Sequence, residues 1–142
     1  MSAPRPLPIP TSLTEGFWEA ARRQELVVQR CADCGAWRHY PQPLCPECHS
    51  ASWAWTPVSG RGRVYTFTVS YKAFHPAWED QVPYVIATIE LDEGVRMVSD
   101  LPHHDTPDVS IGATVEAFFD EVSPEVTLPR FRLVSDGVAS AG

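Results

Sequence analysis

Four cysteines are the residues of this chain whose type and spacing most clearly indicate chemistry. They form two Cys-x₂-Cys pairs, Cys31 with Cys34 and Cys45 with Cys48, and the sequence has no other cysteine. Two such pairs can surround one Zn²⁺ with four thiolates in a tetrahedron. Because four protein ligands leave no position for water, we expect a structural zinc site in a zinc ribbon.

The same cysteines allow other interpretations. Two disulfides would suit an exported domain, but residues 1–10 show no basic segment followed by an apolar one, as an export signal would. A thioredoxin-like redox pair needs a βαβ context and leaves two matched pairs unexplained. Iron fits the same tetrathiolate cage as zinc. We therefore expect a cytoplasmic protein that binds zinc, with iron as the alternative metal.

Residues beside the cysteines are expected to shape the two turns. Gly35 follows the first pair and His49 follows the second, at the place where a tight turn favours a positive φ. His39 and His49 are chemically able to replace a thiolate, but four cysteines make this unnecessary. We therefore expect both histidines to lie outside the set of metal ligands.

Length and charge limit the classes of function. The 142 residues suffice for a small metal-stapled module followed by a domain of about 80 residues. Residues 1–60 carry five basic and five acidic residues, whereas residues 61–142 carry six basic and thirteen acidic ones. An acidic second half repels nucleic acid on average, and no run approaches the ~18 apolar residues of a membrane span. These features argue against nucleic-acid and membrane partners.

The first part of the chain predicts a tail, a helix and a ribbon. Residues 1–11 have proline at every second position from 4 to 10, which predicts a disordered tail. Ser12 and Glu15 have the spacing of a capping box, and the apolar residues that follow predict a helix over residues 13–24. Residues 26–30 and 36–40 predict strands on either side of the first cysteine pair, so that residues 12–59 form helix and ribbon.

The remainder predicts a small β domain, which makes the chain mainly β in class. Strands are expected over residues 64–71, 84–91, 95–99, 114–119 and 130–134. Gly94 suits the left-handed position of a hairpin between the second and third of them. Five strands of this size predict a partly open OB-fold barrel over residues 60–134, and residues 135–142 predict a disordered end.

In this order of elements the chain resembles the acyl-CoA-associated OB-fold family, whose members join an N-terminal helix, a rubredoxin-like zinc ribbon and a C-terminal OB domain. The resemblance covers about residues 12–134. It is carried by Phe17-Trp18, residues 26–35, Pro41, residues 45–48, 60–68, 83–85 and 91–94, and Ile111-Gly112 with Val115. Family members often have Gly where this chain has Gln24-Glu25 and His49, so both turns are expected to be built differently here.

The resemblance implies a non-catalytic partner of thiolase-fold enzymes, of hydroxymethylglutaryl-CoA synthases, or of hydratases and aldolases that degrade steroid side-chain CoA esters. By that resemblance the chain is a subunit of a hetero-oligomer rather than an enzyme. The residues agree, since the sequence has no Gly-x-Ser-x-Gly elbow and no cysteine outside the cage. His103, His104 and Asp105 form one cluster able to suggest acid/base chemistry, but their flanking prolines favour a solvated loop.

Several residues are predicted to make contacts. A module of about 50 residues has too little interior for all its aromatic rings, so we expect Phe17, Trp18 and Trp37 to bind the partner. Candidate CoA-binding residues are Arg61, Arg63 and Lys72. Two other functions stay open: a nucleic-acid module, in which Tyr65, Phe67 and Tyr71 would stack bases, and an iron-bearing electron carrier, which would be coloured.

Overall fold

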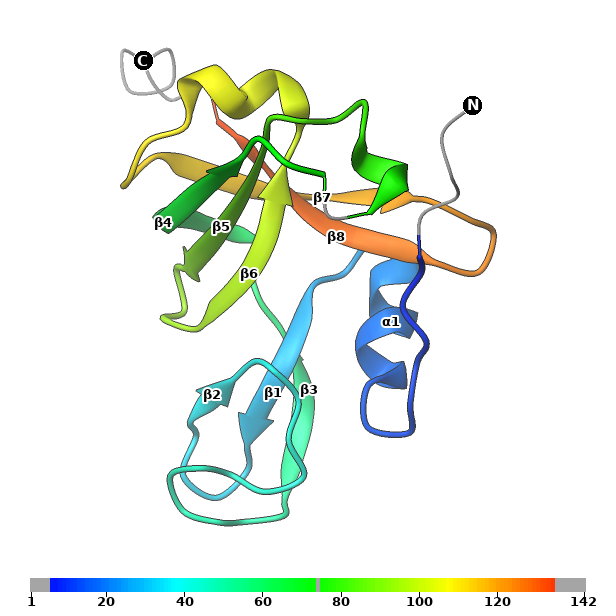
Figure 1. Ribbon diagram of the computed structural model, residues 1–142. Coiled ribbons are helices and arrows are strands. Elements are labelled where there is room, and N and C mark those ends of the chain that lie inside the picture. The colour runs from blue at the N-terminus through cyan, green and yellow to red at the C-terminus, as the bar shows by residue number, and fades with distance from the viewer. Residues whose placement is uncertain (1–5, 74, 135–142) are drawn as a thin grey trace.

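The computed structural model describes residues 6–73 and 75–134, and positions 103, 104 and 106 only along the backbone (Figure 1). Of the two predicted tails, residues 1–5 and 135–142 lie outside this description, as do the side chains of His103 and His104; residues 6–11 of the first tail are described and form no helix or strand. The elements are α1 (Glu15–Arg22), β1 (Val27–Cys31), β2 (Trp37–Arg38), β3 (Trp53–Pro57), β4 (Arg61–Ser70), η1 (Pro76–Trp78), β5 (Tyr84–Leu91), β6 (Arg96–Leu101), η2 (His103–Asp108), β7 (Thr114–Glu121) and β8 (Thr127–Leu133).

The helix α1 is shorter than the sequence predicts, and the predicted capping box does not form. Thr14 is the N-cap without a side-chain cap bond, and its hydroxyl instead accepts the Thr11 N–H at 2.9 Å. That local turn competes with the Ser12-to-Glu15 arrangement because Thr side chains bond readily to nearby backbone. The helix ends at Arg22, and Gln24 takes a positive φ of 62°. The helical turn therefore closes without the glycine that family members often have.

The ribbon is a three-stranded sheet in the order β2-β1-β3, with antiparallel pairing throughout. It lies below the barrel in Figure 1, with α1 beside it. A Cβ at Gly16 of α1 would collide with the indole of Trp55 on β3, so only glycine lets the helix approach the ribbon this closely. The helix and the ribbon therefore pack as one unit.

The barrel is a five-stranded antiparallel sheet in the order β6-β5-β4-β7-β8, which is the strand order of an OB fold. Gly94, with φ 96°, makes the predicted turn between β5 and β6. The interior holds apolar side chains of all five strands together with residues of α1 and β1. The buried members are Phe17, Ala20, Leu26, Val27, Val28, Val64, Val85, Ala87, Ile89, Leu91, Val95, Met97, Leu101, Val115 and Phe131.

A β-bulge in β4 changes which side chains face the core. The pairing of β4 with β5 shifts between Val64 and Thr66, so Tyr65 is an extra residue in the strand. Val64 is buried, Phe67 packs on the core from a partly buried position, and Tyr65 stays 48% exposed. The simple alternation expected for residues 64–71 is therefore wrong at Tyr65.

The barrel stays open between its edge strands β6 and β8, which form no ladder in the described residues. The Val134 N–H donates to the Thr114 carbonyl on β7, so the backbone N–H and C=O groups of every second residue of β8 point toward β7. The backbone groups of the residues between them, including Pro129 and Phe131, point toward the seam, which is the gap between β6 and β8. Proline has no N–H to donate, and this is one physical reason why β6 and β8 form no hydrogen-bond ladder across the seam. Side chains bridge it instead, because Arg130 pairs with Asp100 at 2.8 Å.

Candidate metal centre and partner surface

The two cysteine turns are matched in backbone geometry. In the first, the Gly35 N–H donates to the Cys31 carbonyl at 3.0 Å, and in the second the His49 N–H donates to the Cys45 carbonyl at 2.8 Å. Gly35 and His49 have φ values of 76° and 65°. The predicted positive φ at both positions is confirmed, so His49 builds the same turn as a glycine would and the expectation of a different turn is wrong.

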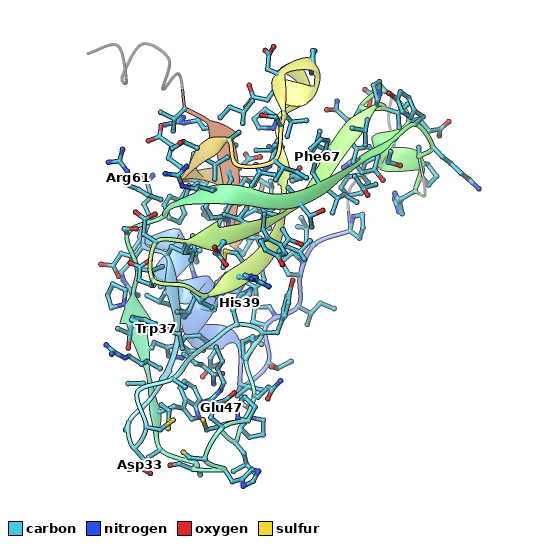
Figure 2. All side chains as sticks on the ribbon, turned by 90° about the vertical axis from the view of Figure 1, so that its left-hand side faces the viewer. Asp33, Trp37, His39, Glu47, Arg61 and Phe67 are labelled. Carbon is cyan, nitrogen blue, oxygen red and sulfur yellow. The ribbon has the colours of Figure 1, made fainter. Side chains whose placement is uncertain are left out.

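The four thiols converge at one end of the ribbon. Their sulfur atoms all lie within 4.8 Å of one another, and the pairs Cys31 to Cys48 and Cys34 to Cys45 are each 3.6 Å apart. A tetrahedron of sulfurs around Zn²⁺ at about 2.3 Å has edges of about 3.8 Å. The spacing of the four sulfur atoms therefore fits a zinc ion. In Figure 2 this end of the molecule is the one labelled Asp33 and Glu47.

The surroundings of the thiols favour the thiolate form at part of the cluster. Hydrogen bonding from the Cys34 backbone, with its N–H 3.4 Å from the Cys31 sulfur, lowers the pKa of Cys31 to about 6. The backbone of Cys48 likewise lowers the pKa of Cys45. At Cys48 the Ser50 backbone lowers the pKa, but the Cys31 thiol and desolvation outweigh it and raise the pKa to about 12. Four thiolates this close require a cation.

Polar side chains that the sequence analysis did not single out brace the ribbon. Arg38 on β2 donates from Nε to the Gln29 Oε1 atom at 2.8 Å and from Nη2 to the Gln42 carbonyl at 2.8 Å, and Gln29 also accepts the Gln42 N–H. Both side chains are buried. Between the two Cys-x₂-Cys turns, the Ser50 hydroxyl donates to the Asp33 carboxylate. A polar residue two positions before the first cysteine was the only local signal for this network.

His39 and Tyr40 lie where the ribbon meets the barrel, and Figure 2 shows His39 well away from the cysteine end. His39 packs against the Phe17 ring at 5.5 Å and belongs to no ligand cluster found among the described residues. The Tyr40 hydroxyl accepts the N–H of Val98 on β6 at 3.1 Å. This bond ties the ribbon to the open edge of the barrel.

The burial of His39 between the ribbon and the barrel predicts that the stability of the fold depends on pH. Burial lowers the pKa of His39 to about 4. Below about pH 6.5 His39 binds a proton in the unfolded chain but not in the folded chain. The free energy of unfolding should therefore decrease as the pH is lowered through this range. Between pH 7.5 and 5.5 the loss from His39 should be about 1 kcal/mol. Urea unfolding at both pH values should show this loss in the wild type and its absence in His39→Phe.

The matched control for that measurement is His49→Gly, because it removes a histidine but leaves His39 in place. This variant should keep the wild-type difference between the two pH values. A His39→Phe variant with the same pH dependence as the wild type would contradict the assignment to His39.

The predicted partner-binding residues fall at different places. Phe17 is buried in the core, with Trp18 packed edge-on against it at 4.9 Å between ring centroids. Trp18 lines a cavity of about 410 Å³ between α1, the ribbon and the barrel. Trp37 is partly buried on β2 beneath the guanidinium of Arg30, which lies 4.5 Å from the ring centroid. The structure therefore brings Phe17 and Trp18 together and leaves Trp37 outside the lining of this cavity.

The candidate CoA-binding residues do not form one cluster. Arg61 and Arg63 lie two positions apart on β4 and are exposed, on one face of the strand. Lys72 follows the other end of this ten-residue strand, roughly 30 Å away along the chain. Figure 2 shows Arg61 at one edge of the barrel. A single phosphate group is unable to contact all three residues.

The aromatic residues considered for base stacking do not form an open platform. The Arg96 guanidinium covers the ring of Tyr65 at 3.7 Å from its centroid, and Arg96 is itself paired with Glu90 at 3.0 Å. Phe67 packs on the core. Tyr71 is 77% exposed, beyond the end of β4. Successive bases need several uncovered rings beside a basic track, and these three residues do not provide them.

Known proteins match this architecture. Residues 18–54 match the family model "ChsH2, rubredoxin-like zinc ribbon domain", and residues 55–120 match "ChsH2, C-terminal OB-fold domain". A DUF35 domain-containing scaffold protein of Methanocaldococcus jannaschii is 37% identical over 101 residues, which cover 70% of this chain and 71% of that protein. The chain belongs to the DUF35 family of ChsH2-type proteins. The zinc-ribbon model and the four gathered cysteines support zinc binding, and neither supports iron.

Two further similarities extend the comparison with DUF35 proteins. The chain is 44% identical over 117 residues to a probable enoyl-CoA hydratase alpha subunit of Thermomonospora curvata, which cover 82% of this chain and 36% of that protein. It spans about a third of the length of such hydratase relatives. A solved structure, "Ltp2-ChsH2(DUF35) aldolase", superposes with a TM-score of 0.80 at 40% identity, covering 89% of this chain and 98% of that chain.

Across the described part of the chain, no helix has the length and apolar character needed to cross a membrane.

Proposed function

We propose that this chain is a non-catalytic scaffold subunit that binds an acyl-CoA enzyme of the thiolase, hydratase or aldolase kind and supports its activity. The observation that carries the proposal is the likeness to the matched chain of an Ltp2-ChsH2(DUF35) aldolase, which extends over 98% of that chain. The names of the hydratase and scaffold relatives point in the same direction.

The metal has a structural role in this proposal. The residues Cys31, Cys34, Cys45 and Cys48 supply four thiolates, and a tetrahedral zinc ion held by four protein ligands has no open position for water or substrate. Zinc supplies no reaction chemistry in such a cage. It fixes the two turns, and through them the ribbon segment after β2 from which Tyr40 reaches the barrel.

The partner contacts centre on the helix and ribbon. We propose that Trp18 is the main anchor, because it is only partly buried and lines the 410 Å³ cavity and Trp is a frequent anchor of interfaces. Phe17 lies beneath it and holds it in place. Trp37, stacked under Arg30, contributes a separate contact on the ribbon.

Contact with the CoA part of the substrate is the finer part of the proposal. Arg61 and Arg63 share an exposed face at the start of β4, and two guanidinium groups suit a phosphate. Lys72 is too distant along β4 to join them, and we propose for it a contact of its own near the η1 loop. Each of these contacts would lie at the edge of the partner's substrate channel.

The test is co-expression of the chain with the thiolase, hydratase and aldolase subunits of its own organism, followed by co-purification and enzyme assay. The wild type should co-purify with one of them and raise its activity. Trp18→Ala should weaken the complex at least about 30-fold, equivalent to about 2 kcal/mol, because it removes a partly desolvated anchor.

The matched control is Tyr71→Ala, which removes a ring of similar size that is 77% exposed and lies outside the cavity lining. It should bind like the wild type, and both variants should keep their zinc. A wild-type chain that co-purifies with none of these enzymes would refute the scaffold function. An intact complex with Trp18→Ala would refute the anchor alone.

A further inference from the structure

A second cavity adjoins the first along the open seam of the barrel. The first, of about 410 Å³, lies between α1, the ribbon, β6 and β8, and the second, of about 400 Å³, lies toward η1. Both are lined by Asp100, Leu128 and Arg130, so they form one surface, which we name the seam groove. In Figure 1, α1 and η1 lie on opposite sides of β8, so the groove crosses that strand.

The first lobe of the seam groove is apolar and partly exposed. Trp18, Tyr40, Val98 and Pro129 are among its lining residues, and Val98 is 51% and Tyr40 53% exposed. The Tyr40 hydroxyl is held by the Val98 N–H, so the ring has a defined position. Exposed apolar surface of this kind marks a binding site, and the lobe has room for a large apolar side chain.

The second lobe repeats this pattern with different residues. His75 and Trp78 pack edge-on with ring centroids 5.8 Å apart, and Ile86 on β5 is 41% exposed beside them. The His75 Nδ1 atom accepts the Ala77 N–H at 3.0 Å, which fixes the imidazole. The lobe therefore presents a pre-formed aromatic wall and an aliphatic floor.

Between the lobes the groove carries an excess of negative charge. Arg130 binds both carboxylate oxygens of Asp100, at 2.8 and 2.9 Å, and one oxygen of Asp120 at 3.1 Å. One guanidinium thus faces two carboxylates, so these three side chains together carry a net charge of −1. Asp100 and Arg130 line both cavities, and Asp120 lies next to them as the second partner of Arg130, outside the cavity lining. The whole of residues 61–142, from which β6 and β8 come, carries thirteen acidic and six basic residues. A basic group is the complement of this centre.

We propose that the seam groove binds a segment of a partner protein in which two large apolar side chains flank a basic one. The apolar side chains fill the two lobes, and the basic group lies over Asp100, on the side where Asp120 adds a second carboxylate to Arg130. This inference rests on the proposed scaffold function, since it names the partner segment that the scaffold holds. An acidic centre between two apolar lobes disfavours a nucleic acid or an anionic membrane surface as the occupant.

A pair of short peptides tests the chemistry of the groove directly. One peptide has Leu and Phe on either side of a central Lys, and the other has Glu in place of Lys. Titrated into the zinc-loaded chain and followed by two-dimensional NMR, the Lys peptide should shift the amide signals of Val98, Ser99 and Arg130. It should bind at least about tenfold more tightly than the Glu peptide, because only its charge complements the groove.

Two charge-matched variants locate the effect. Asp120→Asn removes the excess charge, keeps an oxygen for Arg130 and leaves the Asp100 pair in place, so it should abolish most of the difference between the peptides. Asp92→Asn removes one charge at the exposed turn between β5 and β6 and should preserve the difference. Equal binding of both peptides, or shifts outside the seam groove, would overturn the proposal. Seam shifts on concentrating the chain alone would identify a second copy as occupant and overturn it as well.

The same surface is tested in the complex with its enzyme. Ile86→Asp and Val98→Asp place a carboxylate in each lobe and should release the partner, whereas Ile111→Asp, at a side chain 70% exposed outside the groove, should not. If the wild-type complex forms and all three variants bind equally, the seam groove is excluded while the scaffold function stands. If no enzyme binds but the peptides behave as expected, the scaffold function fails and the groove chemistry stands.

Discussion

Cys34→Ser should empty the metal site and unfold the ribbon. The variant leaves three thiolates around the ion, and a structural zinc site supplies on the order of 10 kcal/mol of metal-binding free energy to its module. Zinc content should fall from about one ion per chain to near zero. The NMR signals of the residues in the two Cys-x₂-Cys turns should move to random-coil positions. The signals of the barrel strands should stay dispersed, and the melting temperature of the barrel should be lower.

The control for the metal prediction is His49→Gly, which changes a neighbour of the ligands and keeps all four cysteines. Gly suits the positive φ of 65° at this position at least as well as His, so zinc content and folding should be retained. Metal analysis of the wild type also separates zinc from iron. A Cys34→Ser chain that stays folded with a full complement of zinc would contradict the assignment of this ligand.

Gly62→Ala should destabilise the barrel by about 3 kcal/mol or more, a large effect for one methyl group. Gly62 is buried in β4, and an added Cβ would collide with the carbonyl group of Glu90 and crowd the Leu91 backbone. Because these obstacles are backbone atoms of the paired strand β5, no side-chain rotation relieves them. The expected result is a lower urea midpoint or a chain that fails to fold.

The matched control on the same strand is Thr66→Ala, at an exposed position. It changes strand propensity without a clash and should cost at most about 1 kcal/mol. If Gly62→Ala lost no more stability than Thr66→Ala, the close approach of β4 and β5 at Gly62 would not be a constraint on the fold.

Features fixed by neighbouring residues could be predicted from the sequence. Two Cys-x₂-Cys turns specify a metal cage by spacing alone, and the structure brings all four thiols within 4.8 Å. The turn at Gly94 followed in the same way from its local conformational freedom. The strand order of the barrel was accessible because five short strands with this spacing have few ways to close a core.

Small local competitions defeated the finer predictions. The helix was expected over residues 13–24 and runs over Glu15–Arg22, because Thr14 bonds to Thr11 and delays its start. The faces of β4 were expected to alternate throughout, but the bulge at Tyr65 reverses them. Neither event has a signal in periodicity, since both depend on single hydrogen bonds or on the partner strand.

The seam groove lay beyond sequence reasoning for a different reason. Asp100 and Arg130 are thirty positions apart, and each reads as an ordinary surface charge in its own strand. Only the curvature of the five-stranded sheet, which brings β6 near β8, places them together, and Trp18 and Tyr40 come from the helix and the ribbon. The predicted CoA-binding residues show the converse. Arg61 and Lys72 are both basic and lie eleven positions apart in sequence, but one begins β4 and the other follows its far end.

The bond from Val98 to Tyr40 has a consequence for handling the isolated chain. An unpaired edge strand is where β proteins recruit copies of themselves and precipitate. Here the ribbon protects that edge, because the Tyr40 hydroxyl accepts a hydrogen bond from the outward N–H of Val98 on β6. Removal of the metal would unfold the ribbon and leave this N–H free to pair with another chain. Chelating agents would then turn a well-behaved subunit into an aggregating one before the barrel itself had melted.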